Sequence, residues 1–117
     1  MLTGTDGVLE GLRRGGTWIE MSTTDEREIK RVAEIAAARG VATLECPVTG
    51  GVHLAAAGKI TVLVGGEQPV FEQHRAALEA MGGQIFYMGE LGKASVIKVI
   101  TNMLAFIHLV AAGEALM

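Results

Sequence analysis

The sequence predicts an α/β protein with a largely parallel sheet, and three observations lead to this fold class. Short β-branched runs alternate with amphipathic helical segments along the chain. Half of the 117 residues are hydrophobic, as in a globular chain with a large buried fraction. Three Gly-rich or hydroxyl-rich loops follow predicted strands, and sheets of this class bind ligands at the carboxyl ends of strands. The loops therefore indicate where a site would lie.

The first third of the chain predicts a short helix, a strand and a longer helix. The short helix covers residues 5–14 and ends at the Gly15-Gly16 pair. Residues 17–21 (TWIEM) form the first strand. The second helix follows with Ser22, Thr23 or Thr24 as its N-cap, a buried stripe that starts at Ile29, and a stop at Arg39-Gly40.

The rest of the chain continues the alternation. Residues 41–48 form a strand that Pro47 breaks, and residues 49–59 form a Gly-rich loop with a helical turn at its end. Residues 60–66 are β-branched and apolar throughout, which is typical of a buried strand. The remaining elements are a helix within 67–83 with Pro69 in its first turn, a strand over 84–89, and one long helix after a Gly-bearing turn.

Composition excludes several functional classes. The net charge of −3 comes with no basic stripe or Lys/Arg block, so we expect neither nucleic acid nor a membrane surface as a partner. A lone cysteine, Cys46, fits a reducing cytoplasm and allows no internal disulfide. The histidines share no metal-site spacing, so we expect no metal. Neither Ser95 nor Cys46 has a paired base in the sequence, which argues against nucleophilic catalysis.

The last helix is apolar on nearly every side, which predicts that other protein covers it. We interpret it as a buried helix, because its tail (103–117) is interrupted by His108 and Glu114 and is short of a membrane span. Little of the chain remains to cover it. We therefore expect either a fragment of a larger chain or a homo-oligomer formed through this helix.

Lys98 lies in the middle of this apolar segment, flanked by Ile97 and Val99, and Asn102 follows one turn later. Residues spaced four apart share one helix face. An unpaired ammonium away from water is costly, so a lysine at this position needs a structural or functional explanation. A lysine that extends its ammonium to the surface is the structural alternative to a catalytic lysine.

Two segments carry a family resemblance: ECPVTGGVHLAAAGKITVLVGG (45–66) and MGELGKASVIKVITN (88–102). They resemble the β-hydroxyacid dehydrogenase family, which includes 3-hydroxyisobutyrate dehydrogenase and tartronate semialdehyde reductase. The family pattern there is D-x-P-V-S-G-G, then G-x-x-G-x-G, then K-x-x-N-N, and WIEMSTTD (18–25) is similar to its I-D-x-S-T segment. Several moderately specific motifs in the right order make a strong signal.

The resemblance implies the later part of a Rossmann-type parallel sheet, followed by the first long helix of an all-helical domain. Residues 1–89 would be a partial dinucleotide-binding domain without its N-terminal half, and residues 90–117 the start of the helical domain. The implied activity is hydride transfer between NAD or NADP and a small β-hydroxy acid or semialdehyde acid. The G-x-G-x-x-G loop is absent, so we expect the chain alone to bind cofactor weakly or not at all and to be inactive.

Four roles are carried over from the family. Lys98 would exchange the proton, and Asn102 would hold the substrate beside it. Thr49, Gly50 and Gly51 would receive the substrate carboxylate, and Thr23 would touch the cofactor near the nicotinamide ribose. The alternatives without a catalytic or binding role are an ordinary turn at 49–51 and a helix N-cap at Thr23.

The chain departs from the family pattern at several positions. Thr49 replaces serine, Ala94 the third glycine, Thr101 the first asparagine, and Glu20 an aspartate. A second hypothesis of another class also stays open: a catalytically inactive, truncated protein that acts as a dimerising interaction module.

Overall fold

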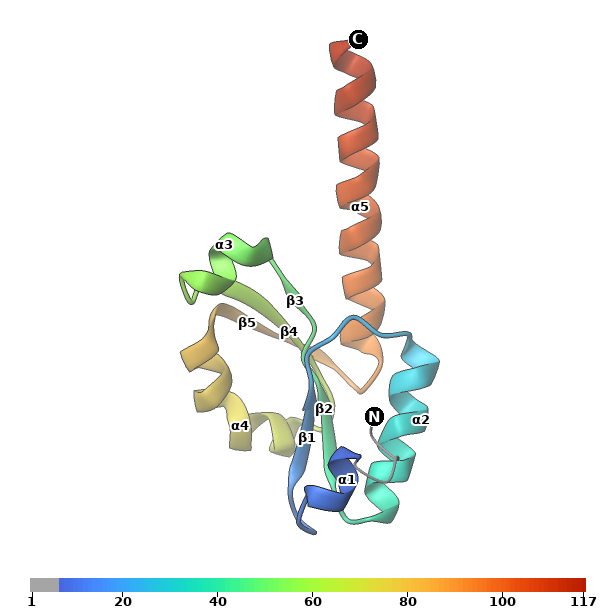
Figure 1. Cartoon of the computed structure of the whole chain (residues 1–117), viewed down its shortest axis with the longest axis vertical. Helices are drawn as coiled ribbons and strands as arrows, with labels where there is room; N and C mark the ends of the chain where they lie inside the picture. The colour runs from blue at the N-terminus through green and yellow to red at the C-terminus, as the bar shows by residue number, and fades with distance from the viewer. Residues whose placement is uncertain (1–6) are drawn as a thin grey trace.

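The computed structural model describes residues 7–117, and its elements follow the predicted alternation of helices and strands (Figure 1). A one-turn helix, α1 (Val8–Gly11), precedes β1 (Thr17–Glu20) and α2 (Glu26–Ala38). The predicted first helix was longer, and its residues 5–6 lie outside the described part. The other elements are β2 (Ala42–Glu45), β3 (Val48–Thr49), α3 (Gly51–Ala56), β4 (Ile60–Gly65), α4 (Gln68–Met81), β5 (Gly82–Gly89) and α5 (Lys93–Leu116).

The five strands form one mixed sheet in which parallel pairing dominates. β1 pairs with β2 in parallel, and β4 pairs with β5 in parallel. The two parallel pairs are joined end to end by a single antiparallel partnership, Glu45 with Gly65, and the short β3 pairs antiparallel with β4. The predicted α/β class with a largely parallel sheet is confirmed, with these two antiparallel pairings as an addition.

This connection brings the carboxyl ends of four strands to one place, which we call the strand junction (Glu20, Glu45, Gly65 and Gly89). The amide of Cys46 donates to the carbonyl of Glu20 at 2.7 Å, which joins the ends of β1 and β2. The amide of Gly66 donates to the carbonyl of Gly89 at 3.0 Å, which joins β4 to β5. The three loops that the sequence singled out leave from this junction.

Helices cover both faces of the sheet. Trp18 and Leu44 point to opposite faces, because Trp18 is in register with Thr43 and side chains alternate along a strand. Leu44 packs with Phe71 and Leu78 of α4. Trp18 packs with Ala36 of α2, in a smaller cluster on the other face that also includes Leu9 and Val41.

Local departures from the predicted boundaries have physical causes. The N-cap of α2 is Asp25, without a side-chain cap, and not Ser22, Thr23 or Thr24. The Ser22 hydroxyl donates instead to Glu20 Oε1 at 2.7 Å, within its own turn. β5 begins at Gly82, two residues early, because a glycine lets the chain pass close to β4: a Cβ at Gly82 would lie 2.8 Å from the Ile60 carbonyl oxygen.

The last helix projects away from the sheet (Figure 1). Its first turns pack against β4, β5 and α2. From Met103 onward every residue is exposed within the described chain, so these residues do not bury the helix themselves and its cover by other protein stays a prediction. At 24 residues α5 is long and apolar enough to span a bilayer by length and composition alone. Core helices of soluble proteins meet the same criterion.

Candidate functional site at the strand junction

A buried carboxylate organises the strand junction. Glu45, the last residue of β2, has a side chain that is only 1% exposed. Its Oε1 accepts hydrogen bonds from three backbone amides at the start of α5: Gly92 at 2.8 Å, Ala94 at 2.8 Å and Ser95 at 3.2 Å. Its Oε2 accepts from the Ser95 hydroxyl at 2.5 Å. The first amides of a helix lack internal partners and carry partial positive charge, so a carboxylate is well stabilised there.

Two glycines make room for this arrangement. A Cβ on Gly65 would lie 2.3 Å from Glu45 Oε1, so any side chain there would displace the carboxylate. Gly92, the N-cap of α5, has φ +99°, and a Cβ there would lie 2.7 Å from Glu26 Cγ. Glycine at both positions therefore lets the strand ends and α2 approach the start of α5 closely.

Lys98 lies one helical turn beyond this clamp and is buried, with 8% of its surface exposed. The ion pairs in the described part of the chain all lie within α2 or within α4, so none neutralises the Lys98 ammonium. Asn102 follows on the same helix face and is half-buried. Thr101 stands where the family pattern has asparagine. Its hydroxyl donates to the Lys98 carbonyl at 2.7 Å, so it bonds within its own helix.

The Thr49–Gly51 segment lies at the end of β3. Thr49 is half-buried and is in register with Thr61 of β4. Gly50 and Gly51 are exposed, with φ +125° and +78°, in the region that favours glycine. Helix α3 begins directly at Gly51, earlier than the helical turn predicted at the end of this loop. β3 pairs with β4 and the first turns of α5 pack on β4, so the turn and the helix that carries Lys98 have this strand as a common neighbour.

Thr23 lies in the loop between β1 and α2, and it is exposed. Because Asp25 is the N-cap of α2, the alternative that Thr23 caps this helix is wrong. The neighbouring Thr24 Oγ1 is buried and has no hydrogen-bond partner among the described residues. The loop thus presents hydroxyls at the carboxyl end of β1 that the helix does not use.

Ser95 and Cys46 are two further buried groups, and we assign neither a catalytic role. Ser95 does acquire a carboxylate partner in the fold, contrary to the expectation from sequence, but it is only 2% exposed and therefore closed to a substrate. Burial, with a smaller contribution from the Glu45 charge, raises the pKa of Cys46 to about 12. A thiol with such a pKa is a poor nucleophile. Among residues 7–117 no cluster of His, Cys, Asp or Glu could hold a metal.

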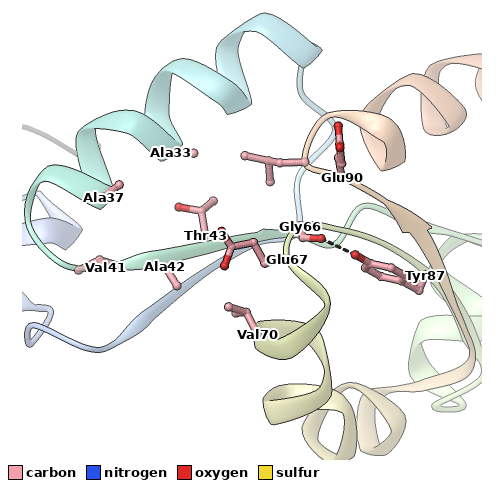
Figure 2. A pocket seen from close by; sticks show the side chains of 11 residues that line it. Ala33, Ala37, Val41, Ala42, Thr43, Gly66, Glu67, Val70, Tyr87 and Glu90 are labelled. Atoms are coloured by element: carbon pink, nitrogen blue, oxygen red, sulfur yellow. Dashed lines mark hydrogen bonds between the residues drawn. The ribbon is translucent and has the colours of Figure 1, made fainter.

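A separate cavity of about 350 Å³ lies where β2 and β4 part, between α2 and α4 (Figure 2). Ala37, Thr43 and Glu67 line it, and the Tyr87 hydroxyl beside it donates to the Gly66 carbonyl at 2.6 Å. The cavity contains none of the residues that the sequence predicted for a site. It extends from Val41 and Ala42 at the start of β2 to Gly66, Glu90 and Leu91 beside the strand junction.

Glu45 is the residue of the site that sequence reasoning missed. A signal for it existed, because it stands at the acidic position of the D-x-P-V-S-G-G pattern and ends an otherwise apolar strand. Its partners are 47 to 50 residues away along the chain, so its role became visible only in the fold.

Comparison with known proteins decides the family. Residues 1–89 match the model of the NAD binding domain of 6-phosphogluconate dehydrogenase. The chain belongs to this NAD-binding family. Over 113 residues it is 40% identical to 3-hydroxyisobutyrate dehydrogenase from Pseudomonas aeruginosa, covering 97% of this chain and 38% of that enzyme. It is also 35% identical to the cytokine-like nuclear factor N-PAC of Xenopus tropicalis, covering 99% of this chain and 22% of that protein.

A solved structure in this group has the same fold. The 3-hydroxyisobutyrate dehydrogenase of Mycobacterium tuberculosis, solved with L-serine, superposes with a TM-score of 0.87 at 33% identity, covering 92% of this chain and 37% of that one. The resemblance to β-hydroxyacid dehydrogenases and the Rossmann-like fold class are thereby confirmed. The chain spans well under half the length of the P. aeruginosa and X. tropicalis relatives.

Proposed function

We propose that the protein carrying this chain is an NAD(P)-dependent oxidoreductase of a small β-hydroxy acid or semialdehyde acid. The observation that carries this proposal is Lys98, a residue only 8% exposed whose ammonium forms no ion pair within the described chain. Among the described residues the Lys98 ammonium is not a buried, unpartnered atom, so it is open to pairing with the oxygen atoms of a bound acid. Family membership supports the proposal, because the P. aeruginosa relative bears the name of such an enzyme.

In this proposal Lys98 handles the proton. On oxidation its amine accepts the proton of the substrate hydroxyl, and on reduction its ammonium donates a proton to the carbonyl oxygen. Asn102, one turn further on the same face, holds the substrate beside it. The Thr49 hydroxyl and the exposed amides of Gly50 and Gly51 receive the carboxylate.

The nicotinamide cofactor supplies or accepts the hydride when it is bound. This chain fits one part of that cofactor: Thr23 is exposed at the carboxyl end of β1, the edge where such sheets bind nucleotides. No two glycines in the sequence are separated by a single residue, so a G-x-G loop for the pyrophosphate is absent from these residues. We therefore expect the 117 residues to bind the acid better than the dinucleotide.

The acid site is testable by the reactivity of Lys98. Acetic anhydride labels exposed amines, and mass spectrometry reports the extent at each lysine. L-serine, the ligand of the M. tuberculosis structure, should protect Lys98 from labelling and leave Lys93, an exposed lysine in the same helix, unprotected. Thr49→Val should weaken the protection, because it removes a hydroxyl and keeps the shape. Equal labelling of Lys98 with and without the acid would exclude the proposed site.

A second candidate function is a dimerising interaction module, and the exposed apolar helix favours it. Apolar side chains of α5 stand open to solvent from Val99 to Leu116, and exposed patches of this kind mark interaction surfaces. One relative is the nuclear factor N-PAC, so a segment similar to this chain also occurs in a protein that is not named as an enzyme. We propose protein rather than a bilayer as the cover, because Glu114 lies within the helix, and we place the protein in the cytoplasm.

Two measurements separate the candidates. Sedimentation of the chain should show a concentration-dependent dimer if α5 self-associates, and Phe106→Glu should abolish it, whereas Arg27→Glu on exposed α2 should not. Protection of Lys98 from labelling by L-serine tests the enzyme candidate. Saturable protection favours the enzyme, and no protection together with a dimer favours the module.

A further inference from the structure

Glu45 connects the two predicted halves of the acid site, and this connection has a consequence for Lys98. On one side the carboxylate holds the amides of Gly92, Ala94 and Ser95, which are the first turn of α5. Lys98 follows Ala94 by four residues and Ser95 by three, so it lies on the same face of the helix, directly after the clamped turn. Long side chains on a helix lean toward its N-terminus, which brings the ammonium back toward that turn.

On the other side, Glu45 leads directly into the turn that would bind the carboxylate. Only Cys46, Pro47 and Val48 separate it from Thr49. The Leu63 amide donates to the Pro47 carbonyl at 2.9 Å, and Val48 is in register with Val62, so this short connection is fixed to β4. The same residue therefore sets the start of the lysine helix and the start of the turn.

A role confined to capping the helix would not require this construction. Ser, Thr, Asp or Asn at the N-cap position supplies an acceptor locally, and α5 instead has Gly92 there with no side-chain cap. Its acceptor comes from a strand 47 residues earlier, and Gly65 is kept without a side chain beside it. The acceptor thus fixes where the helix sits as well as stabilising it.

We propose that Glu45 is a positioning residue, which holds the Lys98 ammonium in register with the Thr49–Gly51 turn. This inference rests on the proposed function for its substrate, and it makes a separate statement about the lysine itself. When Glu45 is altered, Lys98 should lose its fixed, protected position, whether or not an acid is bound.

The test uses the 117-residue chain with Glu45→Gln, which keeps the size and removes the charge, and Glu45→Asp, which keeps the charge. Glu67→Gln, at an exposed carboxylate, is the matched control. Without acid, the labelling rate of Lys98 relative to Lys93 should rise about tenfold in Glu45→Gln, the factor expected for one lost hydrogen bond to a charged group. Glu45→Asp should restore much of the protection, and Glu67→Gln should behave as the parent chain.

With L-serine present, the concentration that half-protects Lys98 should also rise about tenfold in Glu45→Gln. A lowered melting temperature with unchanged labelling and protection would overturn the inference and leave Glu45 a purely structural cap. A changed labelling rate without protection by acid in any variant would support the positioning role and refute the proposed function. If Glu45→Gln does not fold, Ser95→Ala removes one of the four bonds and should shift both readouts in the same direction, and no shift in that variant would overturn the inference.

Discussion

A single methyl group at Gly65 should dislodge the carboxylate at the strand junction. In Gly65→Ala the new Cβ would lie 2.3 Å from Glu45 Oε1 and 2.9 Å from Cδ, against an ordinary contact of 3.4 Å or more. The carboxylate must therefore move by about 1 Å, which breaks its bonds to Gly92 and Ala94 at 2.8 Å. Leaving a buried charge without its partners costs about 3–5 kcal/mol, so we expect the free energy of unfolding to fall by about 3 kcal/mol or more.

Urea denaturation followed by circular dichroism measures this loss. Gly113→Ala is the matched control, because a Cβ there meets nothing within 4 Å, and alanine in an exposed helix should stabilise by up to about 1 kcal/mol. The double variant Gly65→Ala with Glu45→Gln should be less destabilised than the sum of the single changes, because both act on one carboxylate. A loss below about 1 kcal/mol in Gly65→Ala, or strict additivity, would refute the reasoning about this contact.

Three further predictions concern the core and its polar groups. Leu78→Ala should lower the free energy of unfolding by about 2–5 kcal/mol in urea denaturation, because Leu78 is fully buried, whereas Leu116→Ala at an 88% exposed position should change it little. Cys46, with its pKa raised to about 12, should resist iodoacetamide at pH 8 until the chain unfolds, and rapid alkylation of the folded chain would contradict this. The contribution of the protonated thiol to the free energy of unfolding should be complete below pH 9 and be lost as the pH rises from about 9 to 12. Tyr87→Phe removes the bond to Gly66 and should destabilise by about 1 kcal/mol in a thermal melt, and an unchanged melting temperature would show that this bond contributes nothing.

Local patterns predicted most of the elements correctly. The β-branched run at Ile60–Gly65 and the apolar stripes of α2 and α4 carry strong periodicity, so these elements appear where the sequence placed them. Boundaries that depend on competing local bonds were missed. Asp25 rather than Ser22, Thr23 or Thr24 is the N-cap of α2, and β5 begins early at Gly82, because a neighbouring turn and a neighbouring strand decide these positions.

Long-range features were less accessible from sequence. The antiparallel partnership of Glu45 with Gly65 joins strands that the alternation alone would place in parallel, and it gathers the loops at one junction. Lys98 is a buried residue, while the roles of Lys98, Asn102, Thr49, Gly50, Gly51 and Thr23 stay predictions.

The long final helix behaves mechanically as a lever whose pivot is the bond set around Glu45. With a rise of 1.5 Å per residue, a tilt of about 10° would carry the outer tip roughly 6 Å sideways but move Lys98, one turn from the pivot, by only about 1 Å. A movement imposed on the outer end by a docked partner would therefore reach the amine reduced about sixfold.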